Sequence, residues 1–269
     1  MTEFLKSSRE IGLQPALVQG AGGNSSMKIG NKMFVKASGF LMRDMKKGYG
    51  YIELDYKKIR DYIFNLPEDF KTTIQDENKF SAILGKASIE AGMHAILGKY
   101  VFHTHNVYAN VFNCMKGGEE KLREIFEKSV SQWILWIPYK NPGLALAHAI
   151  AQETKKNKLP KIIFLQNHGL ITHSENLKEA VTLTNLVTKK INLSPFALEN
   201  KINKITNYLF PDSIVFPKNP EINSAAKYIL DSIKQLGSKP NFISKKDIQF
   251  IKSIDKEKYR IKMLKNANY

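Results

Sequence analysis

Short apolar runs alternate with longer amphipathic stretches over most of the chain before residue 195. The runs are rich in β-branched and aromatic side chains, which is typical of buried strands. They lie at 32–36, 51–54, 101–105, 133–137 and 161–165, and a further strand begins at 170–172. Helical spacing of apolar positions marks 2–15, 55–64, 88–97, 106–113, 118–130, 143–157 and 174–191. Strands that alternate with helices predict a layered α/β domain.

The pattern changes after residue 194. Residues 195–269 are rich in lysine and keep helical periodicity, but Pro211, Pro217, Pro220 and Pro240 divide them into short pieces. We therefore predict an α/β domain at 1–194 and a helical extension at 195–269. The role of this extension is left open by its sequence.

Composition narrows the class of protein. Hydrophobic residues make up 43% and charged residues 25%, as in ordinary globular proteins. No apolar run is long enough to span a bilayer, and the N-terminus lacks the pattern of a secretory signal. The single cysteine, Cys114, excludes a disulfide framework and a thiolate-rich zinc module. These features predict a cytoplasmic protein without a membrane partner.

The formal net charge of +16 is the unusual property of the composition. The excess is mostly lysine, spread along the chain without interleaved aromatic residues or a nucleic-acid-binding motif. We therefore expect a solvated basic surface rather than a nucleic-acid partner. A positive field would also attract phosphorylated substrates.

Three histidines form a candidate metal site. His103 and His105 end a predicted strand at positions i and i+2, so both imidazoles point to the same face. His168 lies in the turn 166–169, directly after another predicted strand. Three neutral nitrogen ligands leave one coordination position open, which is the pattern of a catalytic metal. Zn²⁺ is favoured, and Mn²⁺, Co²⁺ and Fe²⁺ remain alternatives.

Glu90 and two turns add chemistry to this site. Glu90 precedes the histidine strand, where it can act as a general acid/base or as a fourth ligand. A glycine-rich turn at 19–26 and a second turn at 37–39 offer backbone N–H groups and small hydroxyls to a phosphate. Lys28 follows the first turn and Lys36 directly precedes the second, and each is a candidate for either phosphate contact or a solvated surface.

Six stretches together resemble one known family. They are GAGGNSSMK at 20–28, VKASG at 35–39, SIEAGMHAIL at 88–97, FHTH at 102–105, IPYKNPGLAL at 137–146 and NHGLI at 167–171. The chain resembles the class II aldolase/adducin family from residue 19 to about 190. It looks most like the fuculose- and rhamnulose-phosphate aldolases, in particular the aldolase half of bifunctional rhamnulose-phosphate aldolase/dehydrogenases. FPDSIVF at 210–216 and EKYR at 257–260 are weaker similarities to that branch.

The resemblance implies a three-layer α/β/α sandwich around a largely antiparallel sheet, assembled as a homotetramer with sites at subunit contacts. It implies that His103, His105 and His168 bind zinc and that Glu90 is the catalytic acid/base. Tyr139 falls where some members place a tyrosine that protonates the leaving aldehyde from a neighbouring subunit.

The resemblance also implies a phosphate site. The matching positions are Gly23, Asn24, Ser38, Gly39 and Ser88. Simple members of the family carry two serines before the glutamate, whereas this chain has Ser88 and Ile89. The loss of one hydroxyl weakens the phosphate assignment, so the substrate can differ from a plain ketose 1-phosphate.

These observations predict a metal-dependent aldolase that cleaves or forms a C–C bond in a small ketose phosphate through a metal-stabilised enediolate. The same site would also suit a sugar-phosphate epimerase, dehydratase or decarboxylase. A non-catalytic, adducin-like scaffold is the third alternative, and retention of all three histidines argues against it.

Overall fold

The computed structural model describes residues 1–126, 134–156, 160–191, 193–199 and 207–266. Within these ranges one seven-stranded sheet has the order β3-β2-β1-β4-β7-β6-β5. Its strands are β1 (Asn24–Ile29), β2 (Lys32–Lys36), β3 (Tyr51–Asp55), β4 (Tyr100–Thr104), β5 (Ile134–Ile137), β6 (Ile162–Leu165) and β7 (Gly169–Ser174). Every neighbouring pair is antiparallel except β5 and β6. The predicted antiparallel α/β architecture is therefore confirmed.

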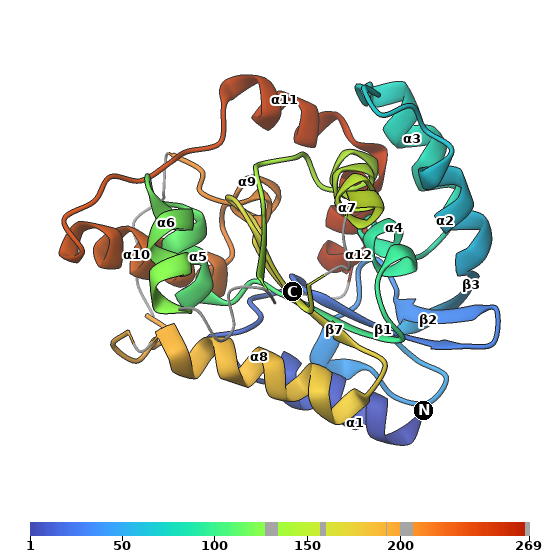
Figure 1. The fold of residues 1–269 in the computed structure, drawn as a ribbon, viewed down its shortest axis with the longest axis horizontal. Helices are drawn as coiled ribbons and strands as arrows, with labels where there is room; N and C mark the ends of the chain where they lie inside the picture. The colour runs from blue at the N-terminus through green and yellow to red at the C-terminus, as the bar shows by residue number, and fades with distance from the viewer. Residues whose placement is uncertain (127–133, 157–159, 192, 200–206, 267–269) are drawn as a thin grey trace.

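Helices cover both faces of the sheet (Figure 1). Those of the first part of the chain are α1 (Thr2–Gly12), α2 (Tyr56–Phe64), α3 (Ile74–Ile83), α4 (Ala91–Ile96), α5 (Val107–Asn113), α6 (Gly118–Ile125), α7 (Leu144–Lys156) and α8 (Leu177–Ile191). A short 3₁₀ turn, η1 (Met42–Asp44), follows β2. On one face, α1 and α8 pack against Phe102 and Met27. On the other, α2, α4 and α7 pack against Val101 and Ile163, which gives three layers.

The predicted helical extension consists of α9 (Pro211–Val215), α10 (Pro220–Gln235), α11 (Lys245–Ser253) and α12 (Asp255–Asn266). Helix α10 buries Ile222 and Ile229 in the same apolar cluster as Phe164 of β6 and Val107 of α5. Figure 1 shows α10 beside α5. Helix α12 contacts α3, where Lys256 Nζ donates to the Ser81 carbonyl oxygen at 3.2 Å. These contacts place the C-terminal segment against the sheet and its helices. The domain boundary at residues 194/195 stays a prediction.

One predicted element was wrong. The turn predicted at 19–26 ends sooner, because Asn24, Ser25 and Ser26 belong to β1, which pairs with β2 and β4. Pairing on both sides satisfies the backbone groups of these residues despite their low strand propensity. Trp133 and residues 127–130, at the edges of a predicted strand and helix, lie outside the described residues. No described helix is long and apolar enough to cross a membrane.

A buried carboxyl group joins α3 to α7. Glu77 is fully buried and accepts a hydrogen bond from the backbone N–H of Leu144, at 2.7 Å, where α7 begins. Gly143 has a φ of 103°, and a Cβ there would lie 2.2 Å from Glu77 Oε1, so only glycine fits. Burial raises the pKa of Glu77 from 4.5 to about 7.

This pKa shift predicts a pH dependence of stability. Between pH 4.5 and about 7 the folded state retains a proton on Glu77 that the unfolded chain has lost. The free energy of unfolding therefore falls as the pH rises through this interval, by up to about 3 kcal/mol from this group. Glu77→Gln keeps an acceptor for Leu144 but cannot ionise. Urea unfolding at about pH 5 and about pH 7.5 should show a smaller loss of stability in the variant. Equal losses in both proteins would contradict the assignment.

Candidate metal centre

Four predicted side chains converge at one buried point. His103 lies in β4, His105 directly follows that strand, and His168 lies in the turn between β6 and β7. Glu90 occupies the N-cap position of α4. One ligand atom from each of the four lies within 4.8 Å of the others, and all four residues are buried. The predicted convergence of the three imidazoles is confirmed.

The carboxylate of Glu90 lies between two of the imidazoles. Its Oε1 is 2.7 Å from His168 Nε2 and 3.4 Å from His103 Nε2. Burial opposes the charged form of Glu90, but His103 and His168 outweigh this and hold the pKa of the carboxyl well below its usual value. Glu90 is therefore ionised at neutral pH.

Several imidazole nitrogens have no hydrogen-bond partner among the described residues. His103 Nε2, His105 Nε2 and His168 Nδ1 are buried in this way. The second nitrogen of His103 and of His105 has a polar neighbour. His103 Nδ1 lies 3.1 Å from the Leu170 carbonyl oxygen, and His105 Nδ1 lies 3.3 Å from Asp212 Oδ2. Burying a polar atom without a partner is costly. The free Nε2 atoms of His103 and His105, clustered with an imidazole nitrogen of His168 and the Glu90 carboxylate, fit a divalent metal ion.

Two glycines allow this crowding. A Cβ on Gly22 would lie 2.6 Å from His105 Nδ1 and 2.7 Å from Asp212 Oδ2. A Cβ on Gly169 would lie 2.9 Å from His103 Cε1. Any larger residue at either position would displace a histidine. Gly22 of the glycine-rich turn is therefore needed to make room for the His105 ring.

A small pocket opens beside Glu90. It is lined by Ala21, Gly23, Lys36, Ser38, Ser88, Ile89, Glu90, Glu257 and Arg260. Asn24 Nδ2 donates to Glu90 Oε2 at 2.6 Å and lies 3.4 Å from Ser88 Oγ. Three of the predicted phosphate residues, Gly23, Ser38 and Ser88, thus lie together, with Asn24 adjacent. Their role in phosphate binding stays a prediction.

Gly39 does not line that pocket. It has a φ of 81°, and a Cβ there would lie 2.6 Å from the Cβ of Met263 in α12. The glycine is required by this close approach and by its backbone conformation. Its predicted phosphate contact is not tested by these observations and stays a prediction.

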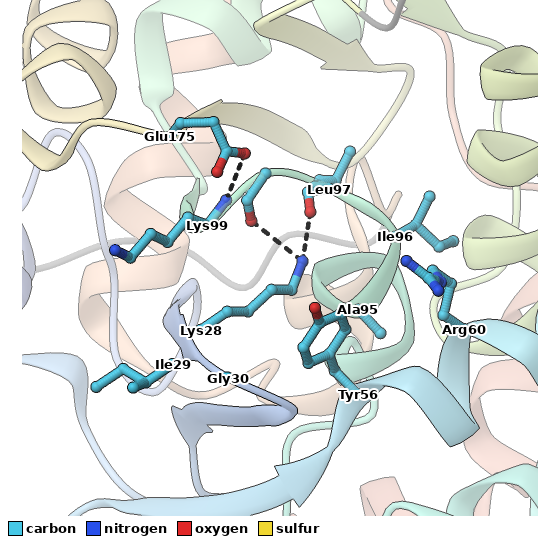
Figure 2. Close-up of a pocket in the computed structure, with 11 residues that line it drawn as sticks. Lys28, Ile29, Gly30, Tyr56, Arg60, Ala95, Ile96, Leu97, Lys99 and Glu175 are labelled. Carbon is cyan, nitrogen blue, oxygen red and sulfur yellow. Dashed lines mark hydrogen bonds between the residues drawn. The ribbon is translucent and has the colours of Figure 1, made fainter.

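The two candidate lysines have different surroundings. Lys36 is 2% exposed, donates to the Phe40 carbonyl oxygen at 2.8 Å and lines the pocket beside Glu90. Burial, assisted by Arg260, lowers the pKa of Lys36 to about 7. Lys28 lies near the opposite end of β1 in a separate pocket, where its amine donates to the carbonyls of Leu97 and Gly98 (Figure 2). It caps the C-terminus of α4 and does not line the pocket beside Glu90.

Tyr139 packs against side chains of the C-terminal segment. Its ring packs against the cluster of Ile214 and Ile251, and its hydroxyl donates to Asn141 Oδ1 at 3.2 Å. Burial raises the pKa of the Tyr139 hydroxyl well above its usual value. It does not line the pocket beside Glu90. A role from a neighbouring subunit stays a prediction.

Asp212, Glu257 and Arg260 were not among the predicted site residues. All three come from the lysine-rich C-terminal segment, where no local periodicity or metal-ligand spacing marks them. The short similarities at 210–216 and 257–260 contain all three, and these were the only sequence signal for them.

A profile of the class II aldolase and adducin N-terminal domain matches residues 2–192. The chain belongs to this family. The family resemblance drawn from the six sequence stretches is thereby confirmed, whereas the closer similarity to rhamnulose-phosphate aldolases stays a prediction. A buried cluster of three histidines and one glutamate that can hold a metal ion is the main feature of this member.

Relatives support the family at low identity. An L-fuculose phosphate aldolase from Methanococcus maripaludis is 25% identical over 197 residues, covering 72% of this chain and 95% of its own length. An uncharacterized oxidoreductase, YuxG of Bacillus subtilis, is 28% identical over 185 residues, or 64% of this chain. The matched part is about a quarter, 26%, of YuxG. The N-terminal class II aldolase domain of a conserved Thermoplasma acidophilum protein has the same fold, with a TM-score of 0.59, 22% identity, and coverage of 70% of this chain and 90% of its own.

The geometry predicts that metal binding depends on the clustered histidines and not on histidine in general. His103→Ala should weaken binding of a divalent ion by more than about 100-fold, beyond the loss typical of an outer contact. His148→Gln is the matched control, because His148 lies on α7 against Phe70 and Gln152. Calorimetric titration with Zn²⁺ and metal analysis after dialysis provide the measurement. Metal retention by His103→Ala would show that the cluster is not the site.

Proposed function

We propose that this protein is a metal-dependent aldolase that cleaves or forms a C–C bond in a small ketose phosphate. The observation that carries the proposal is a single buried site in which three imidazoles meet an ionised carboxylate. A pocket with small hydroxyls and a buried lysine adjoins that carboxylate. The family of the chain and its similarity to an L-fuculose phosphate aldolase support the same reaction class.

His103, His105 and His168 would hold the metal ion, for which Zn²⁺ is the first candidate. When bound, a divalent ion supplies Lewis-acid stabilisation of negative charge that develops on the substrate oxygens. Its site is shielded from water, because all three histidines are buried. Electrostatic stabilisation is strongest in such surroundings.

Glu90 would carry the proton of the reaction. In the direction of bond formation it would remove a proton from the carbon beside the ketone, and in cleavage it would return that proton. Its depressed pKa keeps it ionised, and the hydrogen bond from Asn24 to Oε2 fixes the orientation of the carboxylate. A positioned acid/base of this kind contributes about 10²–10⁴-fold to the rate.

The pocket beside Glu90 would hold the phosphate. Ser38 and Ser88 supply hydroxyls, Gly23 leaves its backbone accessible, and the Lys36 amine contributes positive charge when protonated. Asn24 would complete the contacts, and Gly39 would shape the turn. With Ile89 in place of a second serine, we expect recognition by fewer hydroxyls and a contribution from the cations of the pocket.

Tyr139 would act from a neighbouring subunit of a homotetramer. Within one chain its hydroxyl is bonded to Asn141 and is not in the pocket. A subunit contact would therefore be needed to bring a Tyr139 hydroxyl to the leaving aldehyde.

Replacing Glu90 tests the proposed reaction. Glu90→Gln should keep its metal, because the three imidazoles remain, and should lose turnover by about 10²–10⁴-fold. Glu53→Gln is the control, since Glu53 forms an exposed pair with Lys32 on β2 and β3. Metal content and dihydroxyacetone-phosphate release are measured together on both variants. Full activity of Glu90→Gln would remove Glu90 from the mechanism.

A product analysis decides the reaction class. The wild-type protein is incubated with a panel of ketose phosphates and keto-acid phosphates, and the carbon skeletons of the products are identified. Two shorter products establish an aldolase. An unchanged skeleton of inverted configuration establishes an epimerase, and loss of water or CO₂ a dehydratase or a decarboxylase. Metal analysis that finds no bound ion would favour the scaffold.

A further inference from the structure

The C-terminal segment reaches the metal centre through one carboxylate. Asp212 of α9 is buried, and its Oδ2 lies 3.3 Å from Nδ1 of His105. The guanidinium of Arg260, from α12, contacts both oxygens of Asp212: Nη1 donates to Oδ1 at 2.8 Å and Nη2 to Oδ2 at 3.2 Å. The family profile ends at residue 192, so both residues lie outside the matched region.

The position of Asp212 determines which nitrogen of His105 faces the other ligands. Nδ1 lies against a carboxylate oxygen, and a carboxylate can only accept a hydrogen bond. Nδ1 of neutral His105 must therefore carry the proton, and its Nε2 carries the free lone pair. That Nε2 is buried and has no hydrogen-bond partner among the described residues. Carboxylates that accept from metal-bound histidines fix the ring and increase its basicity.

Arg260 holds Asp212 in place and also lines the pocket beside Glu90. Its Nη2 also donates to the Ala21 carbonyl oxygen at 2.9 Å, and its Nη1 lies 3.3 Å from Glu257 Oε2. The guanidinium lies over the ring of Phe216, 4.9 Å from its centroid. Ala21 immediately precedes Gly22, whose missing side chain makes room for His105 and Asp212. The contacts therefore form one continuous path from α12 through Asp212 to the histidine.

We propose that Asp212 is a positioning residue of the metal centre, which holds His105 in the tautomer that presents Nε2 to the ion. Arg260 anchors Asp212 and so couples the C-terminal segment to metal affinity. This inference rests on the proposed metal-dependent function. The competing explanation is a purely structural ion pair that joins α9 to α12, in which case metal affinity would not depend on Asp212.

The substitution Asp212→Asn separates these explanations. Asparagine has nearly the same shape but no negative charge, and an NH2 group replaces one of the two oxygens. If its oxygen faces His105, the NH2 group faces Nη1 of Arg260, donor against donor, so the full set of contacts made by the carboxylate cannot be kept. We expect the dissociation constant for Zn²⁺ to rise by about 10–100-fold. We also expect the visible absorption spectrum of the Co²⁺-loaded protein to change, because the orientation of one ligand changes. Neither readout depends on turnover.

Asp231→Asn is the matched control. Asp231 lies in α10 of the same segment and pairs with Lys227 at 2.8 Å on the surface. Its removal should leave Zn²⁺ affinity and the Co²⁺ spectrum unchanged. An Asp212→Asn protein that is folded by circular dichroism and binds Co²⁺ with unchanged affinity and spectrum would overturn the proposal.

A second measurement needs no variant and covers the case in which Asp212→Asn does not fold. Nitrogen-15 NMR of the wild-type protein, labelled at histidine and loaded with Zn²⁺, identifies the protonated nitrogen of each ring. We expect His105 to be protonated at Nδ1 and ligated through Nε2; the reverse assignment would overturn the proposal. Wild-type protein that binds no metal would also overturn it. Wild-type protein that binds metal but cleaves no sugar phosphate would refute only the aldolase reaction, and the Asp212 measurements would still stand.

Discussion

Antiparallel pairing of β4 with β1 on one side and β7 on the other is the constraint on which the site depends. The register places Asn24 opposite His103 on one side and Ile171 opposite His103 on the other. The turn that carries His168 therefore meets the end of β4 where His105 emerges. A shift of one residue in either register would turn His103 to the opposite face of the sheet. Strand pairing thus sets the ligand geometry before any metal binds.

Burial of so many ionisable groups would be unfavourable if they did not compensate one another. Glu90 is stabilised by the imidazoles, and Asp212 by Arg260 and His105, so burial fails to raise either pKa. The ion pair with Asp212 raises the pKa of Arg260, although burial opposes its charge. Lys36 lacks such a dominant partner, and burial lowers its pKa to about 7. Its charge therefore responds to an anion in the pocket, since a nearby phosphate favours the protonated amine.

The candidate metal centre could be predicted from the sequence because each of its signals is local. Two histidines on one strand, a histidine in a turn after a strand and a glutamate before a strand are each recognised from a few neighbouring residues, although Glu90 and His168 lie 78 positions apart. The start of strand β1 was missed, because Asn24, Ser25 and Ser26 have low strand propensity and depend on two neighbouring strands for their pairing. The contact between Gly39 and Met263 was equally invisible, since it joins residues more than two hundred positions apart. The contacts of Asp212 with His105 and with Arg260 are also tertiary contacts between distant parts of the sequence.

The C-terminal segment, which the family profile does not match, also forms part of the pocket beside Glu90. The family match covers the sheet, the three histidines and Glu90, which are the parts that any reaction of this kind requires. The pocket beside Glu90 has a second wall made by Glu257 and Arg260 of α12, beyond the matched residues. The family match therefore carries no information on this wall. Substrate identity therefore has to be established on this chain itself, because part of the charge in this pocket comes from its C-terminal segment.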